Sequence, residues 1–340
     1  MRFLYANTAN IYPQDRHLID GLRELGHEVV EASDMESIRR EAPACDAVFV
    51  GFTSPLFVMK VRRAAPGKKV FFNAVTSQYE ANIVSRGEVG HFFLKAIKWW
   101  LVDALSFHLS DKVLLESDAQ IRYSSRLFLV PRRKLVKAYS GLNEKEFFYD
   151  PSVAKASQFT VLFRGRFLPE SGILTVIEAA KKLEDAGVKF LIIGHGLLYR
   201  EFNALMARLA PKNVEHIHDK MPVDELRRRM LGCHVSLGQM ADHPRLKRTL
   251  PCKLFESLAL RLPYLTGRNP AVFEMLEEGR TCLAAKPGDA DDLAAQILYL
   301  RDNPEVRERI AAAGYELYKA RLTSKALAQE ALDGCLGTRR

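Results

Sequence analysis

The chain has 340 residues, 48% of them hydrophobic and 27% charged, which is typical of a folded protein large enough for two domains. Its net charge of +9 favours an anionic partner such as a nucleotide, a phospholipid, an acidic sugar or a nucleic acid. The five cysteines form no CxxC pair and no Cys/His cluster at metal spacing, so we expect free thiols in a reducing compartment and no metal.

The opening "MRFLYANTAN" has the pattern of a strand and lacks the charged, apolar and cleavable regions of a signal peptide. No uncharged apolar run reaches the length of a membrane span. These features predict a cytoplasmic protein, and they leave peripheral contact with the inner face of the cytoplasmic membrane open.

Short apolar runs alternate with helical stretches in the first half of the chain. The runs predict buried strands at 2–6, 27–32, 46–51, 68–73, 112–117 and 135–139. Segments between them, such as 15–25, have apolar residues at helical spacing, which favours a doubly wound parallel sheet. The polar stretch 140–158 predicts a linker, so we expect a first domain over 1–150.

The same alternation then starts again. It predicts strands at 159–166, 188–196, 213–217, 234–239, 262–267 and 281–285, and helices near 170–185, 197–209, 222–231, 251–260, 270–278 and 289–301. The tail is expected to be helical over 304–336 with a break near Leu322. We predict an α/β protein with a second domain at 151–320 and a final helix at 321–340 that could pack back on the first. Twin Rossmann-like domains would face each other across a cleft, with ligands at the carboxyl ends of the strands.

Two strand–turn–helix junctions in the second half carry glycines. Gly165 and Arg166 end a strand and Gly172 precedes a helix, which suits an anionic ligand, although the glycines could equally serve the turn and Arg166 could be solvated. His195 stands between glycines in "IIGHGLLYR", a weaker signal that favours an ordinary loop residue.

A third junction, "RTLPCKLFES", has an unusual charge. The positive end of a helix favours acidic residues, yet Arg248 precedes this helix and Lys253 lies in its first turn, after the basic loop 238–248. A bound diphosphate would explain the cations, with Glu256 accepting hydrogen bonds from a neighbouring ribose. The alternative is a surface pair between Lys253 and Glu256.

Several segments of the second half resemble a GT-B glycosyltransferase of the retaining family 4 type (glycosyl transferases group 1). They are "FRGRFLPESGILTVIEAAKKL", "FLIIGHG", "LPCKLFESLALRLPYLTGRNPAVFEML" and "GDADDLAAQILYLRDNPEVRERIAAAG". The first half is similar more loosely, through "LRELGHEVVEA", "LVDALSFHLSDKVLLESDAQ" and "VKAYSGLNEKEFF". The resemblance implies transfer of a sugar from a nucleotide-diphosphate sugar to a glycan, lipid-linked or small-molecule acceptor, with retention of configuration and no cofactor.

The resemblance also implies roles for individual residues. Arg166 and Lys253 would contact the donor diphosphate, and Glu256, the second glutamate of the E-x7-E motif, would bind the ribose. Further donor contacts are expected from Gly165, Arg248, Thr249 and Gly196. The departing nucleoside diphosphate would be stabilised by fixed cations and helix ends without a metal, and its phosphate would act as the base in a front-face attack.

The sequence departs from the family pattern at two places. Arg248 stands where the first glutamate of the motif is expected, and Gly238 is the alternative equivalent, so the sugar contacts of that glutamate are in doubt. Ser171 replaces a lysine before Gly172, and Lys253 or Arg248 could take over the missing charge.

The first half holds the expected acceptor side, for which we select Asn7, Tyr79 and Arg86, the last two in the loop segment 73–87. Arg86 could instead form a structural ion pair. The apolar stretch 88–111 suits a core helix, or an interfacial helix whose tryptophans and lysines hold the protein against anionic lipid.

Two other functions remain open from the sequence. A GT-B epimerase or hydrolase would cleave a sugar nucleotide without an acceptor. A degenerate member would bind nucleotide without turnover, as the two departures suggest. Nucleic-acid binding is not expected, because the cations follow strand ends instead of forming one stripe with aromatic residues.

Overall fold

The computed structural model describes residues 1–338 apart from residues 9–10, 53–54 and 87–92. The chain divides into two compact units. The N-terminal unit comprises Met1–Asn143, Arg248–Leu250 and Arg321–Arg340, and the C-terminal unit comprises Glu144–Lys247 and Pro251–Ala320.

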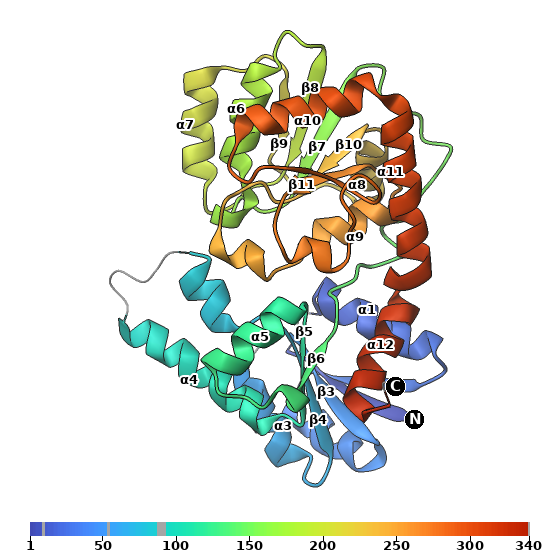
Figure 1. Ribbon diagram of the computed structural model, residues 1–340. Helices are drawn as coiled ribbons and strands as arrows, with labels where there is room; N and C mark the ends of the chain where they lie inside the picture. Colours follow the sequence, from blue (N-terminus) through green and yellow to red (C-terminus); the bar gives the residue numbers. More distant parts are fainter. Residues whose placement is uncertain (9–10, 53–54, 87–92, 339–340) are drawn as a thin grey trace. The chain divides into compact units, whose positions relative to one another are not determined.

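Within the described residues, the N-terminal unit contains a six-stranded parallel sheet with the order β2-β1-β3-β4-β5-β6. Its strands are β1 (Arg2–Ala6), β2 (Glu28–Ala32), β3 (Ala47–Val50), β4 (Lys69–Val75), β5 (Lys112–Leu115) and β6 (Leu135–Lys137). Its helices are α1 (Pro13–Glu24), α2 (Met35–Glu41), α3 (Pro55–Ala64), α4 (Phe93–Leu109), α5 (Asp118–Leu127) and α12 (Ser324–Leu336), which Figure 1 shows around the sheet.

The C-terminal unit, as far as it is described, also contains a six-stranded parallel sheet, with the order β12-β11-β10-β7-β8-β9. Its strands are β7 (Phe159–Arg164), β8 (Val188–Ile193), β9 (Val214–Ile217), β10 (Val235–Leu237), β11 (Tyr264–Gly267) and β12 (Leu283–Ala285). Its helices are α6 (Ile173–Lys182), α7 (Tyr199–Leu209), α8 (Val223–Leu231), α9 (Cys252–Ala259), α10 (Ala290–Asp302) and α11 (Pro304–Leu317).

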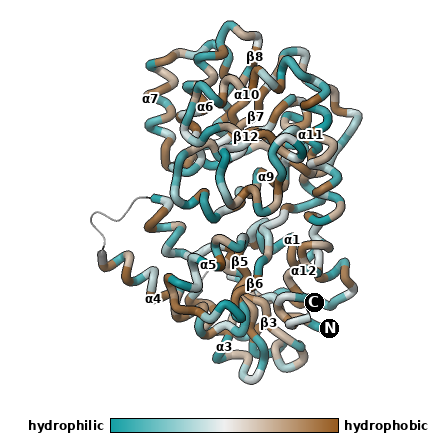
Figure 2. Tube along the Cα trace, in the orientation of Figure 1, coloured by the Kyte–Doolittle hydropathy of each residue, from teal (hydrophilic) through white to brown (hydrophobic). Residues whose placement is uncertain are grey.

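The strands are apolar along most of their length because helices cover both faces of each sheet, as parallel sheets require. Figure 2 shows the apolar segments gathered along the strands of each unit. The core of the C-terminal unit includes Val161, Phe163, Phe190 and Ile192, all without exposed surface. In each sheet the first strand lies between neighbours reached in opposite directions, which is the switch point where open α/β sheets bind ligands.

Every predicted strand is present, with ends that differ by a few residues; 135–139, for example, is reduced to Leu135–Lys137. The predicted break in the tail is confirmed, since α11 passes into a π-helical turn at Tyr318–Leu322 and Thr323 caps α12. The predicted helix at 270–278 is wrong. It is a single 3-10 turn, Val272–Glu274, because the backbone around Glu277 instead closes a turn through hydrogen bonds with Thr281 and Cys282.

The last helix of the chain, α12, packs against α1 within the N-terminal unit. Leu18, Ile19 and Leu22 of α1 share an apolar cluster with Ala328, Ala331 and Leu332 of α12. The two helices approach closely at Gly21, where an added Cβ would lie 2.0 Å from the carbonyl oxygen of Ser324. Glycine is therefore needed at this position for packing.

Gly21→Ala is expected to destabilise the N-terminal unit by about 1–3 kcal/mol, because α12 must move away from the new methyl group. This loss exceeds the gain of up to about 1 kcal/mol that alanine brings to a helix. Urea unfolding followed by tryptophan fluorescence reports on this unit, because both tryptophans, Trp99 and Trp100, belong to it. Glu24→Ala, an exposed change on the same helix, serves as the control. Equal midpoints for the two variants would contradict the packing role.

Candidate functional site

The ends of β7 and β8 meet through two glycines with left-handed backbones. Gly165 has φ of +143° and Gly194 has φ of +141°, conformations that L side chains rarely adopt. A Cβ on Gly194 would lie 2.1 Å from the carbonyl oxygen of Gly165. The N–H of Gly165 in turn donates to the carbonyl oxygen of Ile193 at 3.0 Å. Gly196 repeats the pattern, since its Cβ would lie 2.6 Å from the backbone nitrogen of Phe167.

A hollow of about 650 Å³ opens beside these glycines, within the size range of small-molecule sites. It lies at the carboxyl ends of β7, β8 and β9, and the rings of His195 and His218 stack there with centroids 4.9 Å apart. Its lining residues are Arg164, Gly165, Arg166, Ile193, Gly194, His195, His218, Asp219, Lys220, Met221 and Leu226. Three cations against one carboxylate, with flat rings beside them, suit an anionic ligand that carries an aromatic group.

Lys253 lies against the glycine at the end of β7. Its ammonium Nζ is 4.0 Å from the centroid of the Phe163 ring and 3.4 Å from the carbonyl oxygen of Gly238. A Cβ on Gly165 would lie 3.5 Å from Nζ, so the glycine leaves space beside the amine. Burial lowers the pKa of Lys253 to about 7, against the opposing effect of Glu256. An amine held in this costly state is a typical feature of functional sites.

Glu256 follows Lys253 on α9 and is almost fully buried. Its Oε2 forms an ion pair with Arg164, the last residue of β7, and the Arg164 guanidinium lies 5.2 Å from the centroid of the Phe147 ring. Burial would lower the pKa of Arg164, but the facing carboxylate of Glu256 outweighs burial and raises it. Arg164 was missed in the sequence analysis. The signal was a charged residue closing the otherwise apolar strand "FTVLFR".

The N-terminus of α9 carries no side-chain cap. Its N-cap residue is Pro251, which has no group to accept a hydrogen bond, and the first turn contains no acidic residue. The first N–H groups of a helix need partners, and a helix start that lacks them is suited to an anion.

The surroundings of Arg248 are formed by the N-terminal unit. This residue belongs to the three-residue segment Arg248–Leu250 of the N-terminal unit, and its guanidinium contacts Oε1 of Glu80 at 2.7 Å. The same guanidinium lies over the ring of Tyr123, 3.9 Å from its centroid. Glu80 is fully buried, so this ion pair neutralises a carboxylate that would otherwise be very costly. A donor contact by Arg248, as the sequence predicts, would have to share a guanidinium already paired with Glu80.

The predicted site residues are divided between the two units. Thr249 Oγ1 and Asn7 Oδ1 are buried with no hydrogen-bond partner among the described residues. The N–H of Tyr79 donates to Asp103 at 2.7 Å, and Arg86 is exposed. The predicted site residues Gly165, Arg166, Gly196, Lys253 and Glu256 all lie in the C-terminal unit, whereas Asn7, Tyr79, Arg86, Arg248 and Thr249 lie in the N-terminal unit.

Ser171, one of the departures from the family pattern, and Gly238, the alternative equivalent of the first glutamate, also lie in the C-terminal unit. Ser171 is fully buried, and its carbonyl oxygen accepts a hydrogen bond from the N–H of Met240. Gly238 is packed so tightly that a Cβ would lie 2.4 Å from the hydroxyl of Tyr264. Both positions therefore have packing roles in this structure.

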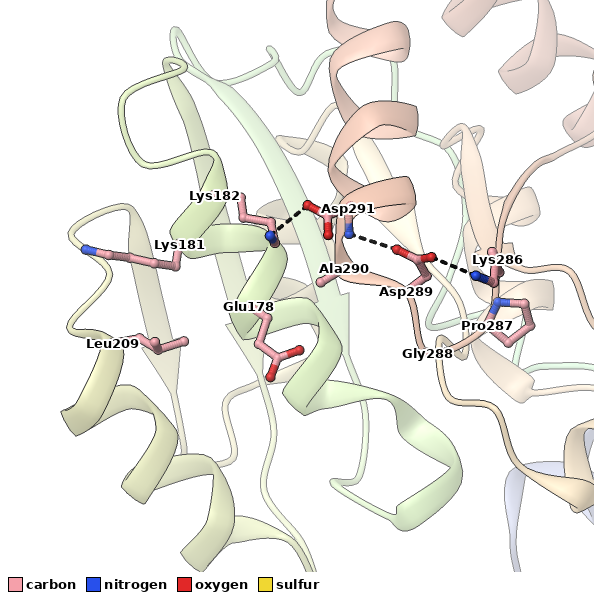
Figure 3. A pocket seen from close by; sticks show the side chains of 10 residues that line it. All are labelled: Glu178, Lys181, Lys182, Leu209, Lys286, Pro287, Gly288, Asp289, Ala290 and Asp291. Carbon is pink, nitrogen blue, oxygen red and sulfur yellow. Dashed lines mark hydrogen bonds and ion pairs between the residues drawn. The ribbon is translucent and has the colours of Figure 1, made fainter.

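A second hollow, of about 550 Å³, lies between α6 and the start of α10 (Figure 3). Its charges pair with one another, Lys182 with Asp291 at 2.7 Å and Lys286 with Asp289 at 3.1 Å. Asp289 also caps α10 by accepting from the N–H of Asp291. These pairs fix the helix start, and the hollow lacks the cationic excess of the one beside Arg166.

Among the described residues, no group of three His, Cys, Asp or Glu side chains is placed to hold a metal ion. In the same part of the chain, none of the helices combines the length and the apolar character needed to cross a bilayer.

The fold agrees with that of known proteins. The family model of glycosyl transferases group 1 matches residues 144–317, just over half of the chain, and the protein therefore belongs to this family. Its fold is GT-B, with two Rossmann-like units. The structure is similar over 100% of both chains to Anabaena Alr3699/HepE, solved in complex with UDP (TM-score 0.72, 14% identity). It is also similar over 97% of both chains to a sucrose-phosphate synthase from Thermosynechococcus elongatus (TM-score 0.74, 13% identity).

Two curated relatives show the extent of the sequence similarity. An uncharacterised glycosyltransferase, MJ1178, of Methanocaldococcus jannaschii is 25% identical over 236 residues, 63% of each chain. The alpha-D-kanosaminyltransferase of Streptomyces kanamyceticus is 26% identical over 154 residues, 44% of this chain and 38% of the relative. The chain thus spans less than two thirds of the length of these relatives.

The lowered pKa of Lys253 predicts a pH-dependent stability. Unfolding returns the amine to its ordinary pKa of 10.5, so between pH 7 and 10.5 the unfolded chain binds the extra proton and stability rises with pH. Relative to that of Lys253→Met, the free energy of unfolding of the wild type should rise by up to about 1.4 kcal/mol per pH unit above pH 7. The rise is smaller where water screens the half-buried amine.

Calorimetric melting of both proteins at pH 6.5 and pH 9 measures this difference. The melting temperature of the wild type should rise against that of Lys253→Met at the higher pH. A constant difference would show that the amine keeps its ordinary pKa in the folded protein.

Proposed function

We propose that the protein is a glycosyltransferase that moves a sugar from a nucleotide-diphosphate sugar to a glycan, lipid-linked or small-molecule acceptor, with retention of configuration. The observation that carries this proposal is the half-buried amine of Lys253 between the strand-end Gly165 and the uncapped start of α9. An amine with a pKa near 7 at a helix terminus without a side-chain cap gains most from a doubly charged anion.

The diphosphate of the donor would lie at this junction. Gly165 leaves room for phosphate oxygens to approach the backbone, the N–H groups of α9 point toward them, and Lys253 supplies a positive charge. Arg166, exposed at the edge of the hollow, would add a second cation with two parallel hydrogen bonds.

The nucleoside would occupy the hollow itself. The stacked rings of His195 and His218 provide a flat apolar surface for a base, and Gly196 lets the loop after β8 approach closely. Glu256 would bind the ribose. Its Oε2 is held by Arg164, which fixes the carboxylate and leaves Oε1 to accept hydrogen bonds from the diol. Anabaena Alr3699/HepE, which has a similar fold, was solved in complex with UDP, and this supports a nucleotide as ligand.

In the proposed reaction the bond between the anomeric carbon and the diphosphate oxygen breaks, and a bond to the acceptor oxygen forms on the same face of the sugar. The acceptor hydroxyl gives its proton to the departing phosphate. Lys253, Arg166 and the α9 terminus stabilise the charge that develops on the leaving group, so the proposal needs no metal. Asn7, Tyr79 and Arg86 are proposed to contact the acceptor, and Arg248 and Thr249 remain proposed donor contacts.

One observation favours a second candidate function, that of an epimerase or hydrolase. Neither Arg248, which is paired with Glu80, nor Gly238 is an acid at the position of the first glutamate of the E-x7-E motif, so the sugar contacts expected from that glutamate are in doubt. An epimerase or hydrolase would cleave the donor without an acceptor. Incubation with sugar nucleotides in the presence and absence of acceptors separates the two functions by acceptor dependence.

A thermal-shift screen against UDP, GDP, ADP and dTDP sugars tests donor binding directly. A matching nucleotide at about 100 times its Kd should stabilise the protein by about 2.7 kcal/mol, a shift of several degrees. Lys253→Met and Arg166→Ala should each lose most of this shift, because each removes a cation facing the diphosphate.

Lys247→Met is the matched control, since Lys247 is an exposed lysine of the basic loop 238–248 that precedes α9. It should keep the full shift. If no nucleotide stabilises the wild type, or if Lys247→Met loses as much as Lys253→Met, the proposed donor site is wrong. A shift without turnover would identify a degenerate member.

A further inference from the structure

The exposed side of α4 is apolar. Leu94, Ile97, Leu101 and Leu105 are spaced by three, four and four residues, so they lie on one face of the helix, and they are 39–81% exposed. The opposite face packs inward, where Asp103 and Phe107 are buried. Figure 1 shows α4 along the outside of the N-terminal unit, and Figure 2 shows the brown colour of apolar residues along much of it.

Two neighbouring elements extend this surface. On one side the hydroxyl of Ser106 donates to the carbonyl oxygen of Pro55, next to Leu56, which is 41% exposed. On the other side the indole N–H of Trp100 donates to the carbonyl oxygen of Leu127 at 2.9 Å, close to Leu129 in the chain. We call Leu56, Leu94, Ile97, Leu101, Leu105 and Leu129 the apolar face.

Leu129 occupies a position where glycine would be less costly. It follows α5 with φ of +53°, and the N–H of Val130 donates to the carbonyl oxygen of Ser125, the pattern of a Schellman cap. Leucine is strained in this left-handed conformation, and its side chain is 75% exposed. The chain thus keeps a leucine that costs stability in its backbone and gains nothing from burial within the described structure.

Several exposed cations lie close in the chain to residues of the apolar face. Arg126, Arg132 and Arg133 are exposed beside Leu129, and Lys98 is exposed between Ile97 and Leu101. The sequences of α3 and α4 contain one acidic residue, Asp103, which is buried and accepts from the N–H of Tyr79. A second copy of the chain would bring like charges together across a two-fold axis, which disfavours a dimer through this face.

From these observations we propose that the apolar face docks on the surface of a bilayer containing anionic phospholipid. The leucines enter the boundary between head groups and acyl chains, α4 lies in the plane of the membrane, and the surrounding cations contact lipid phosphates. This binding is separate from the donor chemistry of the C-terminal unit, and it would bring the protein to a lipid-linked acceptor.

Co-sedimentation of the full chain with vesicles tests the proposal, without donor or acceptor present. Binding is expected to phosphatidylcholine vesicles with 30% phosphatidylglycerol, and weaker binding to phosphatidylcholine alone or at high salt. Leu129→Gly should lower partitioning on the order of tenfold while the protein stays folded, because glycine relieves the strained backbone. Replacing Arg132 or Arg133 by serine should cost about fivefold for each residue, on the anionic vesicles alone.

Ala210→Gly is the matched control, because Ala210 also has a left-handed backbone (φ of +41°) at the end of a helix but lies outside the apolar face. It should bind like the wild type. Leu101→Ser is a second variant that should weaken binding. The proposal fails if the wild type does not bind the anionic vesicles, or if Leu129→Gly and Leu101→Ser bind unchanged. It also fails if light scattering shows a dimer that Leu101→Ser dissociates.

Discussion

The close approach of the backbones at the ends of β7 and β8 is the constraint on which the candidate site depends. Gly194 can pass the carbonyl oxygen of Gly165 only because Gly194 carries no side chain. The Lys253 amine lies beside Gly165 and over the ring of Phe163, and Glu256 of the same helix is paired with Arg164. The cations, the start of α9 and the hollow therefore lie at one edge of the sheet, where the ends of β7 and β8 are almost in contact.

The fold could be predicted from the sequence because buried parallel strands leave a strong signal. Runs such as "VKFLII" are apolar at all but one position, and each was assigned as a strand. Local patterns failed where tertiary hydrogen bonds decide the structure. Residues 270–278 have the spacing of a helix, but the chain turns there because Glu277 bonds to Thr281 and Cys282 in the approach to β12.

The candidate site was predictable to the extent that charge at a helix start is visible in the sequence. Lys253 and Glu256 were identified in this way, and the structure places both beside Gly165 and Arg164. The ion pair of Arg248 with Glu80 joins residues 168 positions apart in the chain. A local sequence pattern does not predict such a distant partner. Sequence reasoning placed Arg248 with Lys253 because they are neighbours in the chain, whereas the fold assigns Arg248–Leu250 to the N-terminal unit.

The N-terminal unit is assembled from three separate pieces of chain, of which the last is Arg321–Arg340. During synthesis the apolar surface of α1 around Leu18 and Leu22 has no cover until α12 has been made. The N-terminal unit can therefore be completed only after α12, which follows the C-terminal unit in the chain, so most of the C-terminal unit can fold earlier. Nascent chains that stop short of residue 324 would expose this surface and be candidates for chaperone binding and aggregation.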